Sequence, residues 1–196
     1  MSGNEHIIET RAPDPGAAVL KKTVVMVGMM GAGKTAVGRA LAARLGVPFL
    51  DSDAEIEAAA NMTIPEIFAR DGEAFFRARE TEVIARLLQD RPGVLSTGGG
   101  AFLSPANRRL ISDQGVSVCL QADLDVLWQR VRHKDTRPLL RSPDPRETLR
   151  ALYEARAPIY ALADLTVVSD GLASVEEMVD RVLAALATRP DVLAEK

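Results

Sequence analysis

Residues 28–35 read Gly28-Met29-Met30-Gly31-Ala32-Gly33-Lys34-Thr35, which is the G-x-x-x-x-G-K-T pattern of a phosphate-binding loop. Glycines allow successive backbone N–H groups to point into one concavity that suits phosphate oxygens, and a following helix N-terminus favours anions. Lys34 supplies a flexible positive charge for the outer phosphates, and Thr35 supplies a hydroxyl for Mg²⁺. The stretch therefore predicts a nucleotide site built around the backbone of residues 31–33.

The segments on either side of this loop strengthen the prediction. Thr23–Val27 is a short, apolar, β-branched run, which is typical of a buried parallel strand. After the loop, Val37, Leu41 and Leu45 recur at helical spacing, and Gly46 ends the pattern. A glycine loop that joins a buried strand to a helix is the context that this motif requires, whereas a chance glycine turn would not need it.

The rest of the chain alternates strands with helices. The predicted strands are 23–27, 48–50, 94–97, 116–120 and 165–168. The predicted helices are 33–45, 53–60, 64–69, 73–89, 104–113, 123–132, 145–161 and 174–187. This alternation predicts a three-layer α/β/α fold with a five-stranded parallel sheet, in which ligands gather at the carboxyl ends of the strands.

Composition limits the class of protein. The 196 residues carry a net charge of −3, which argues against a protein that binds nucleic acid through a basic surface. The single cysteine, Cys119, lies in an apolar run and is expected to be a buried thiol, which excludes an internal disulfide. Neither a signal peptide nor a run of about 18 apolar residues is found, so we expect a cytoplasmic protein with no membrane partner.

One compact α/β domain is expected over residues 21–188, between a flexible N-terminal tail at 1–20 and a frayed C-terminal tail at 189–196. Residues 133–145 interrupt the pattern with three prolines and a dense set of charges. This segment is too polar for the core and too broken for a helix. Two interpretations stay open, a mobile lid that carries Arg137 and a plain solvated linker.

Acidic residues follow the second strand as Asp51-Ser52-Asp53. Because residues i and i+2 of an extended chain project from the same side, both carboxylates face the ligand edge of the sheet. One carboxylate can hold Mg²⁺ through water, and the other can accept a proton from a substrate hydroxyl. The alternative is that both are helix caps, since Asp is favoured immediately before a helix.

Two further groups have both a functional and a structural interpretation. The three glycines of Gly98–Gly100 follow a buried strand, where bare backbone amides suit a ligand, although a flexible turn needs the same residues. Arg77 and Glu80 are helical neighbours, so the carboxylate can orient the guanidinium toward an anionic ligand. A routine surface ion pair would show the same spacing.

Taken together, these residues resemble the shikimate kinase family over about residues 23–186. The resemblance rests on an ordered set of motifs: Gly28–Thr35, Asp51-Ser52-Asp53, Phe76-Arg77 with Glu80, Gly98–Gly100, Arg137-Pro138-Leu139-Leu140 and Arg156-Ala157-Pro158-Ile159-Tyr160. It implies a nucleoside monophosphate kinase-like fold whose five strands, counted along the chain, are ordered 2-3-1-4-5. It also implies a monomer that transfers the ATP γ-phosphate to the 3-hydroxyl of shikimate, with one Mg²⁺, in aromatic amino acid biosynthesis.

The resemblance also implies a role for each matching residue. On the acceptor side it implies contacts with shikimate from Asp53, the possible base, Arg77, Arg156, Gly98, Gly99 and Gly100, with Phe76 as a wall and Glu80 orienting Arg77. On the nucleotide side it implies contacts from Gly31, Ala32, Gly33, Lys34, Arg130, Arg137 and Ser169, with Thr35 and Asp51 at the metal. Ala36 departs from the family, in which a second hydroxyl often stands there.

Two other classes of protein compete with this interpretation. Another small-molecule kinase, such as a gluconate kinase, would share the phosphate loop and the sheet but would not need Gly98–Gly100 together with Asp53, Arg77 and Arg156. A non-catalytic nucleotide-binding regulator would be expected to have lost Lys34 or Asp53, and both are present.

Overall fold

The computed structural model describes residues 18–133 and 141–195. Its centre is a five-stranded parallel sheet in the order β3-β4-β2-β5-β6. The strands are β2 (Thr23–Val27), β3 (Phe49–Asp51), β4 (Val94–Ser96), β5 (Gly115–Ala122) and β6 (Leu165–Ser169). Counted along the chain, this order is the predicted 2-3-1-4-5, and the predicted fold class is confirmed.

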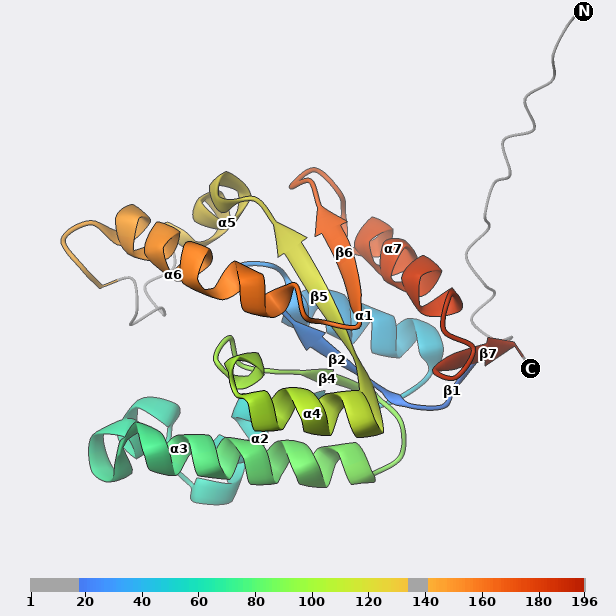
Figure 1. The fold of residues 1–196 in the computed structure, drawn as a ribbon, viewed down its shortest axis with the longest axis horizontal. Helices are drawn as coiled ribbons and strands as arrows, with labels where there is room; N and C mark the ends of the chain where they lie inside the picture. The colour runs from blue at the N-terminus through green and yellow to red at the C-terminus, as the bar shows by residue number, and fades with distance from the viewer. Residues whose placement is uncertain (1–17, 134–140, 196) are drawn as a thin grey trace, which may run out of the picture.

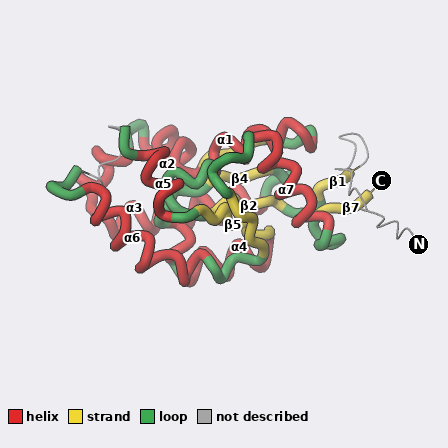
Figure 2. Tube along the Cα trace, turned by 90° about the horizontal axis from the view of Figure 1, so that it is seen from above, coloured by secondary structure: helices red, strands yellow, loops and turns green. Residues whose placement is uncertain are grey.

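Helices cover both faces of the sheet, as Figures 1 and 2 show. They are α1 (Lys34–Leu45), α2 (Ser52–Ala60), α3 (Ile64–Gln89), α4 (Pro105–Gln114), α5 (Leu124–Val131), α6 (Pro145–Tyr160) and α7 (Val175–Ala187), with a short 3₁₀ turn η1 (Ala101–Leu103). On one face α1 packs against α7, and on the other α3 packs against α4. None of the helices in the described ranges has the length and apolar character that crossing a bilayer requires.

The central strand β2 explains why the phosphate loop lies where it does. All five of its side chains are buried, and it pairs with β4 on one side and β5 on the other. The backbone N–H and C=O groups on both edges of such a strand are hydrogen-bonded to neighbouring strands, and helices cover both of its faces. It therefore forms the rigid middle of the domain. The loop that follows it therefore opens at the centre of the carboxyl edge, where neighbouring strand ends also point.

The span α3 consists of two helical segments, as predicted for 64–69 and 73–89, because Gly72 between them has non-helical backbone angles of φ 82° and ψ 172°. This φ is a left-handed value that glycine adopts at little cost, so the chain changes direction there. A capping box between Thr63 and Glu66 begins the helix.

The two expected tails are partly structured, which corrects the prediction. Ala18–Leu20 forms strand β1 and pairs antiparallel with β7 (Leu193–Glu195), next to the main sheet. Val192 is fully buried, so residues 189–195 are not frayed. Each strand is three residues long and neither is recognisable alone, because the two become a sheet only by pairing across most of the chain.

We expect this small sheet to stabilise the whole domain. Ending the chain after Thr188 removes Val192 and Leu193, which are 0% and 6% exposed. Two buried aliphatic side chains correspond to about 3–5 kcal/mol of unfolding free energy, measurable by urea denaturation. The matched control is Lys22→Ala, which breaks an exposed ion pair with Asp191 and should cost less than about 1 kcal/mol. Equal midpoints for the truncated and full chains would contradict the expectation.

Candidate active site

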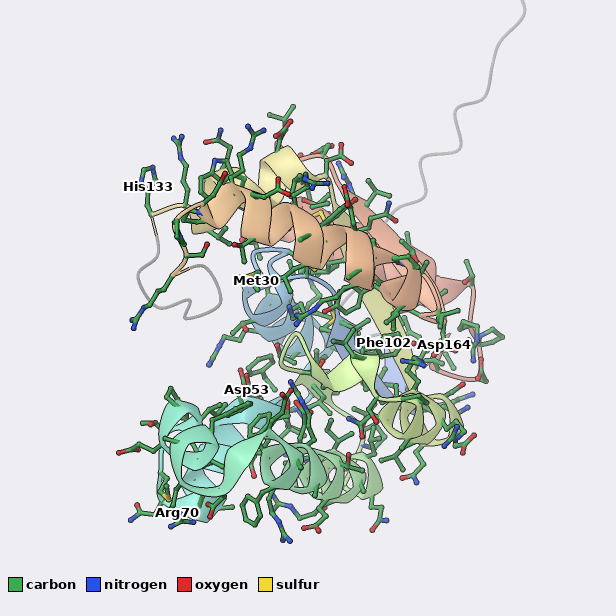
Figure 3. All side chains as sticks on the ribbon, turned by 60° about the vertical axis from the view of Figure 1, so that its left-hand side comes forward. Met30, Asp53, Arg70, Phe102, His133 and Asp164 are labelled. Atoms are coloured by element: carbon green, nitrogen blue, oxygen red, sulfur yellow. The ribbon has the colours of Figure 1, made fainter. Side chains whose placement is uncertain are left out.

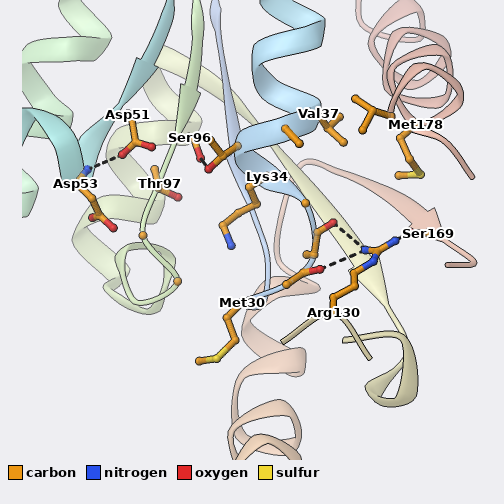
Figure 4. A pocket seen from close by; sticks show the side chains of 18 of the residues that line it. Met30, Lys34, Val37, Asp51, Asp53, Ser96, Thr97, Arg130, Ser169 and Met178 are labelled. Atoms are coloured by element: carbon orange, nitrogen blue, oxygen red, sulfur yellow. Dashed lines mark hydrogen bonds between the residues drawn. The ribbon is translucent and has the colours of Figure 1, made fainter. Parts of the chain in front are cut away.

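A cavity of about 650 Å³ opens at the carboxyl edge of the sheet. The cavity is lined by most of the residues predicted for the nucleotide, the metal and the base, and by two of the glycines predicted for the acceptor: Gly31, Ala32, Gly33, Lys34, Thr35, Asp51, Asp53, Arg130 and Ser169, with Gly98 and Gly99. Figure 4 shows them arriving from separate strand ends and from the first turn of α1. Segments that are up to about 140 residues apart in the chain thus meet because parallel strands all end at one edge.

The phosphate loop has the backbone that the motif predicts. Gly28, Gly31 and Gly33 have φ values of 135°, 81° and 98°. A Cβ on Gly28 would lie 2.7 Å from the Leu120 carbonyl oxygen, so a larger residue cannot replace it without moving β5. Gly33 is also the N-cap of α1 and provides no side-chain cap. The first amides of the helix therefore remain available to an anion.

The side chain of Lys34 extends back toward the start of this loop. Its Nζ donates to the carbonyl oxygens of Gly28 at 2.8 Å and Met29 at 3.0 Å. These contacts hold the ammonium group beside the loop amides, in the cavity that Asp53 also lines. The positive charge is thus fixed where a phosphate held by the loop would lie.

The predicted metal ligands also lie in the cavity. Thr35 Oγ1 is 3.4 Å from Ser96 Oγ, and Asp51 begins α2 by accepting hydrogen bonds from the amides of Asp53 and Ala54. The capping interpretation of Asp51 is therefore correct, and it leaves the second carboxylate oxygen for another contact. Hydroxyl and carboxylate oxygens are hard ligands that fit Mg²⁺. Among the described residues no group of three or more His, Cys, Asp or Glu side chains is arranged to hold a metal ion.

Asp53 is the most perturbed acid of the cavity. Burial raises its pKa to about 6, the negative charges of Asp51 and Glu80 add to the shift, and Lys34 opposes it. Its Oδ1 is buried without a hydrogen-bond partner among the described residues. A Cβ on Gly98 would lie 2.7 Å from that oxygen, so the glycine makes room for the carboxylate. The oxygen is poised for a donor that none of the described residues supplies.

Figure 3 places Asp53 across the cavity from the phosphate loop, where Met30 is labelled. A neutral hydroxyl donor between them would contact Asp53 on one side and loop-bound phosphate on the other. Arg70 and His133, also labelled, lie at the periphery. His133 therefore has no part in the cavity.

Arg77 is held by a buried carboxylate. Its Nη1 donates to Glu80 Oε2 at 2.8 Å, and the Glu80 side chain is 1% exposed. The alternative of a routine surface ion pair is therefore wrong. Burial raises the pKa of Glu80, and the Arg77 charge opposes that shift. A Cβ on Gly100 would lie 2.7 Å from Arg77 Nη1, so this glycine lets the guanidinium reach the loop.

Arg156 approaches the same glycine loop from α6. A Cβ on Gly99 would lie 3.7 Å from both Arg156 Nη1 and the Tyr160 hydroxyl. Among the described residues no carboxylate lies within ion-pair distance of Arg156. Neither Arg77, Arg156 nor Gly100 lines the main cavity, which ends at Gly99. The two arginines instead flank the loop just beyond it, which makes a neighbouring cationic corner for an anionic group.

On the other side of the phosphate loop, Arg130 joins the loop to the end of β6. Its guanidinium donates to the carbonyl oxygens of Gly31 at 3.2 Å and Ala32 at 3.4 Å, and to Ser169 Oγ at 3.1 Å. This side of the cavity extends to residues that no sequence motif predicted: Ala173, Ser174, Val175 and Met178. Their only sequence signal is position, since they follow β6 and open α7.

Phe76, predicted as a wall of the acceptor site, does not line the main cavity. Phe76 is 4% exposed and belongs to a small core with Ile56 and Ile67, where its ring contacts the Arg77 guanidinium. It therefore lies behind Arg77 rather than along the main cavity. Arg137, together with residues 134–140 of the predicted lid, lies outside the described residues.

Comparison with known proteins agrees with this geometry. The family model for shikimate kinase matches residues 30–187. A shikimate kinase from Ruegeria pomeroyi is 76% identical over 193 residues, which is 98% of each chain. The solved shikimate kinase from Acinetobacter baumannii in complex with shikimate is 39% identical with a TM-score of 0.79, and covers 85% of this chain and 93% of its own.

A gluconokinase from Sinorhizobium meliloti also superposes, with a TM-score of 0.58 and 22% identity, over 86% of this chain and 93% of its own. At that identity the likeness shows a shared fold alone. The family match spans the phosphate loop from Met30, Asp53, the glycine loop and both arginines. The chain therefore belongs to the shikimate kinase family.

Proposed function

We propose that this chain transfers the γ-phosphate of ATP to the 3-hydroxyl of shikimate and releases shikimate 3-phosphate and ADP. One observation carries the acceptor assignment: the unpartnered Oδ1 of Asp53 is buried opposite a phosphate loop, in the cavity that Lys34 lines. A carboxylate placed there can accept the proton of an attacking hydroxyl. Phosphoryl transfer otherwise needs positioning and charge neutralisation, which the loop and Lys34 supply.

The cationic corner supports a carboxylated acceptor. Arg77 is aimed by Glu80, and Arg156 has no carboxylate partner among the described residues. Two guanidinium groups match one carboxylate, and the amides of Gly98–Gly100 match hydroxyl or carboxylate oxygens. Gluconate also carries a carboxylate, so charge alone does not choose between the two acids. The match to the shikimate kinase family favours shikimate.

Magnesium fits the oxygen ligands on this edge. Thr35 would hold it directly, with Asp51 acting through water and Ser96 beside them. When bound, the ion would neutralise charge on the nucleotide phosphates. Arg130, Ser169 and the start of α7 would contact the nucleotide beyond the phosphates. The role of Arg137 on those phosphates stays a prediction from the family resemblance.

The test is ADP release measured directly for the purified chain with ATP, Mg²⁺ and one acceptor at a time. We expect turnover with shikimate and little or none with gluconate. Shikimate lacking its carboxylate, added as the matching triol, should show a KM raised about 100-fold, since two guanidinium groups lose their partner. Turnover with gluconate but not shikimate would overturn the proposal.

The raised pKa of Asp53 predicts a dependence on pH. The proton-accepting form is the ionised carboxylate, so kcat/KM should be constant above the pKa of about 6 and fall below it. At pH 5 about a tenth of the plateau value is expected for one ionisation. Quantifying ADP by chromatography avoids the pH dependence of coupling enzymes. A profile that stays flat down to pH 5 would contradict the assignment of Asp53 as base.

A further inference from the structure

Tyr160, the last residue of α6, contacts the glycine loop through its hydroxyl. The side chain is 4% exposed, and its O–H donates a hydrogen bond to the Gly99 carbonyl oxygen. The carbonyls of the two flanking glycines have backbone partners, since Gly98 accepts from Ala101 and Gly100 accepts from Leu103. The Gly99 carbonyl thus depends on Tyr160 for its bond among the described residues.

This bond sets the direction of a peptide unit. In a trans peptide the C=O of one residue and the N–H of the next point to opposite sides. Holding the Gly99 oxygen toward α6 therefore turns the Gly100 N–H away from α6. That N–H has no protein acceptor among the described residues, and Gly100 is the residue against which the Arg77 guanidinium packs.

The tyrosine ring belongs to the main hydrophobic core. Phe102 stacks against it at 6.4 Å between ring centroids and 14° between planes, and Figure 3 shows Phe102 beside α6. Tyr160 also lines a second, smaller cavity of about 100 Å³ together with Met29, Cys119 and Tyr153. Because part of the ring borders unfilled space, the hydroxyl bond adds a directional contact that packing does not supply.

The cationic corner also bears on this hydroxyl. Tyr160 stands one helical turn after Arg156, and a Cβ on Gly99 would be equally close to both. Burial raises the pKa of Tyr160, and the charges of Arg156 and Arg77 oppose the shift. The hydroxyl therefore stays protonated, and it lies near the Arg156 guanidinium as well as the Gly99 carbonyl.

We infer that Tyr160 is a positioning residue for the acceptor site: its hydroxyl orients the Gly99–Gly100 peptide so that the Gly100 N–H and the Arg77 and Arg156 guanidinium groups face one anionic group. The inference rests on the proposed function for its ligand, but the loop contact stands without it. Tyr160 acts on the acceptor and leaves the nucleotide loop unchanged.

The variant Tyr160→Phe removes the hydroxyl and keeps the ring. We expect the KM for shikimate to rise about tenfold, with kcat and the KM for ATP within about twofold of wild type. The control is Tyr153→Phe, the same change on the same helix beside the same small cavity, where the hydroxyl makes no hydrogen bond among the described residues. It should leave both KM values unchanged.

Hydrogen exchange gives a readout that does not depend on turnover. Amides of residues 98–101 should exchange faster in Tyr160→Phe than in wild type or Tyr153→Phe, while the core strand β2 stays protected. Unchanged exchange together with an unchanged shikimate KM would overturn the inference, as would an equal rise in both KM values with a lowered Tm. If wild type fails to use shikimate while Tyr160→Phe still loosens the loop, the proposed acceptor is wrong and the positioning role stands.

Discussion

Replacing Asp53 by Asn is expected to lower kcat by about 10²- to 10⁴-fold, because an amide cannot accept the proton of the attacking hydroxyl. The amide is nearly the same size, so it still fits against Gly98. Nucleotide binding should persist, since the phosphate loop and Lys34 are untouched. The measurements are steady-state kinetics with shikimate and calorimetric titration with ADP. A near-normal kcat would remove Asp53 from the mechanism, and a parallel loss of ADP affinity would indicate a disrupted loop.

The same substitution should raise thermal stability, which separates lost chemistry from lost folding. Since the pKa of Asp53 is raised to about 6, the native state holds this proton more tightly than the unfolded state does. Its contribution to stability therefore falls as pH rises from about 4 to 6, and at pH 8 the ionised carboxylate is a net cost. Asp53→Asn should have a higher Tm than wild type at pH 8, and the gap should close at pH 4. Asp180→Asn, in an exposed pair with Arg44, should show no such gap.

Replacing Arg77 by Ala is expected to raise the KM for shikimate about 100-fold, because it leaves a substrate carboxylate short of one of two cationic partners. The matched control is Arg79→Ala on the same helix, where the arginine pairs with Glu82 in solvent. That change should leave the KM within about twofold of wild type. An unchanged KM in Arg77→Ala would show that the carboxylate binds elsewhere.

A second variant separates the loss of substrate binding from a loss of folding stability in Arg77→Ala. Arg77→Ala leaves Glu80 buried without its partner, which is expected to cost stability. The double variant Arg77→Ala with Glu80→Gln removes that buried charge, so its Tm should recover. Its KM for shikimate should stay high, because the guanidinium is still absent. Recovery of both quantities together would mean that Arg77 serves the fold and not the substrate.

Much of the site follows from local pattern. The loop from Gly28 to Thr35 specifies its own backbone, since the left-handed φ values require glycine, and the buried run before it must be a central strand. Once the sheet is parallel, Asp53 and Gly98 must share its carboxyl edge. The proximity of these segments can be inferred without the structure, because the ends of parallel strands lie at the same edge of the sheet.

Other features depend on partners distant in the chain. The strands β1 and β7 exist only as a pair, so neither had a local signal and both were predicted as tails. Arg77 with Glu80 had the spacing of an ordinary surface pair, and only the packing of α3 over η1 and α4 reveals a buried carboxylate. Tyr160 resembled any helix-ending aromatic residue until α6 placed its hydroxyl on Gly99.

The sequence by itself determined the phosphate loop and the parallel sheet, which are encoded in residues that are neighbours or that repeat at a fixed period. The strand order and the family of kinases followed from the resemblance of the ordered motifs to that family. Only the tertiary structure decided which charges are buried, how far the pKa of Asp53 rises, and which side chains hold the glycine loop. Burial and desolvation are properties of the packed whole, because they depend on what every other segment places around a group.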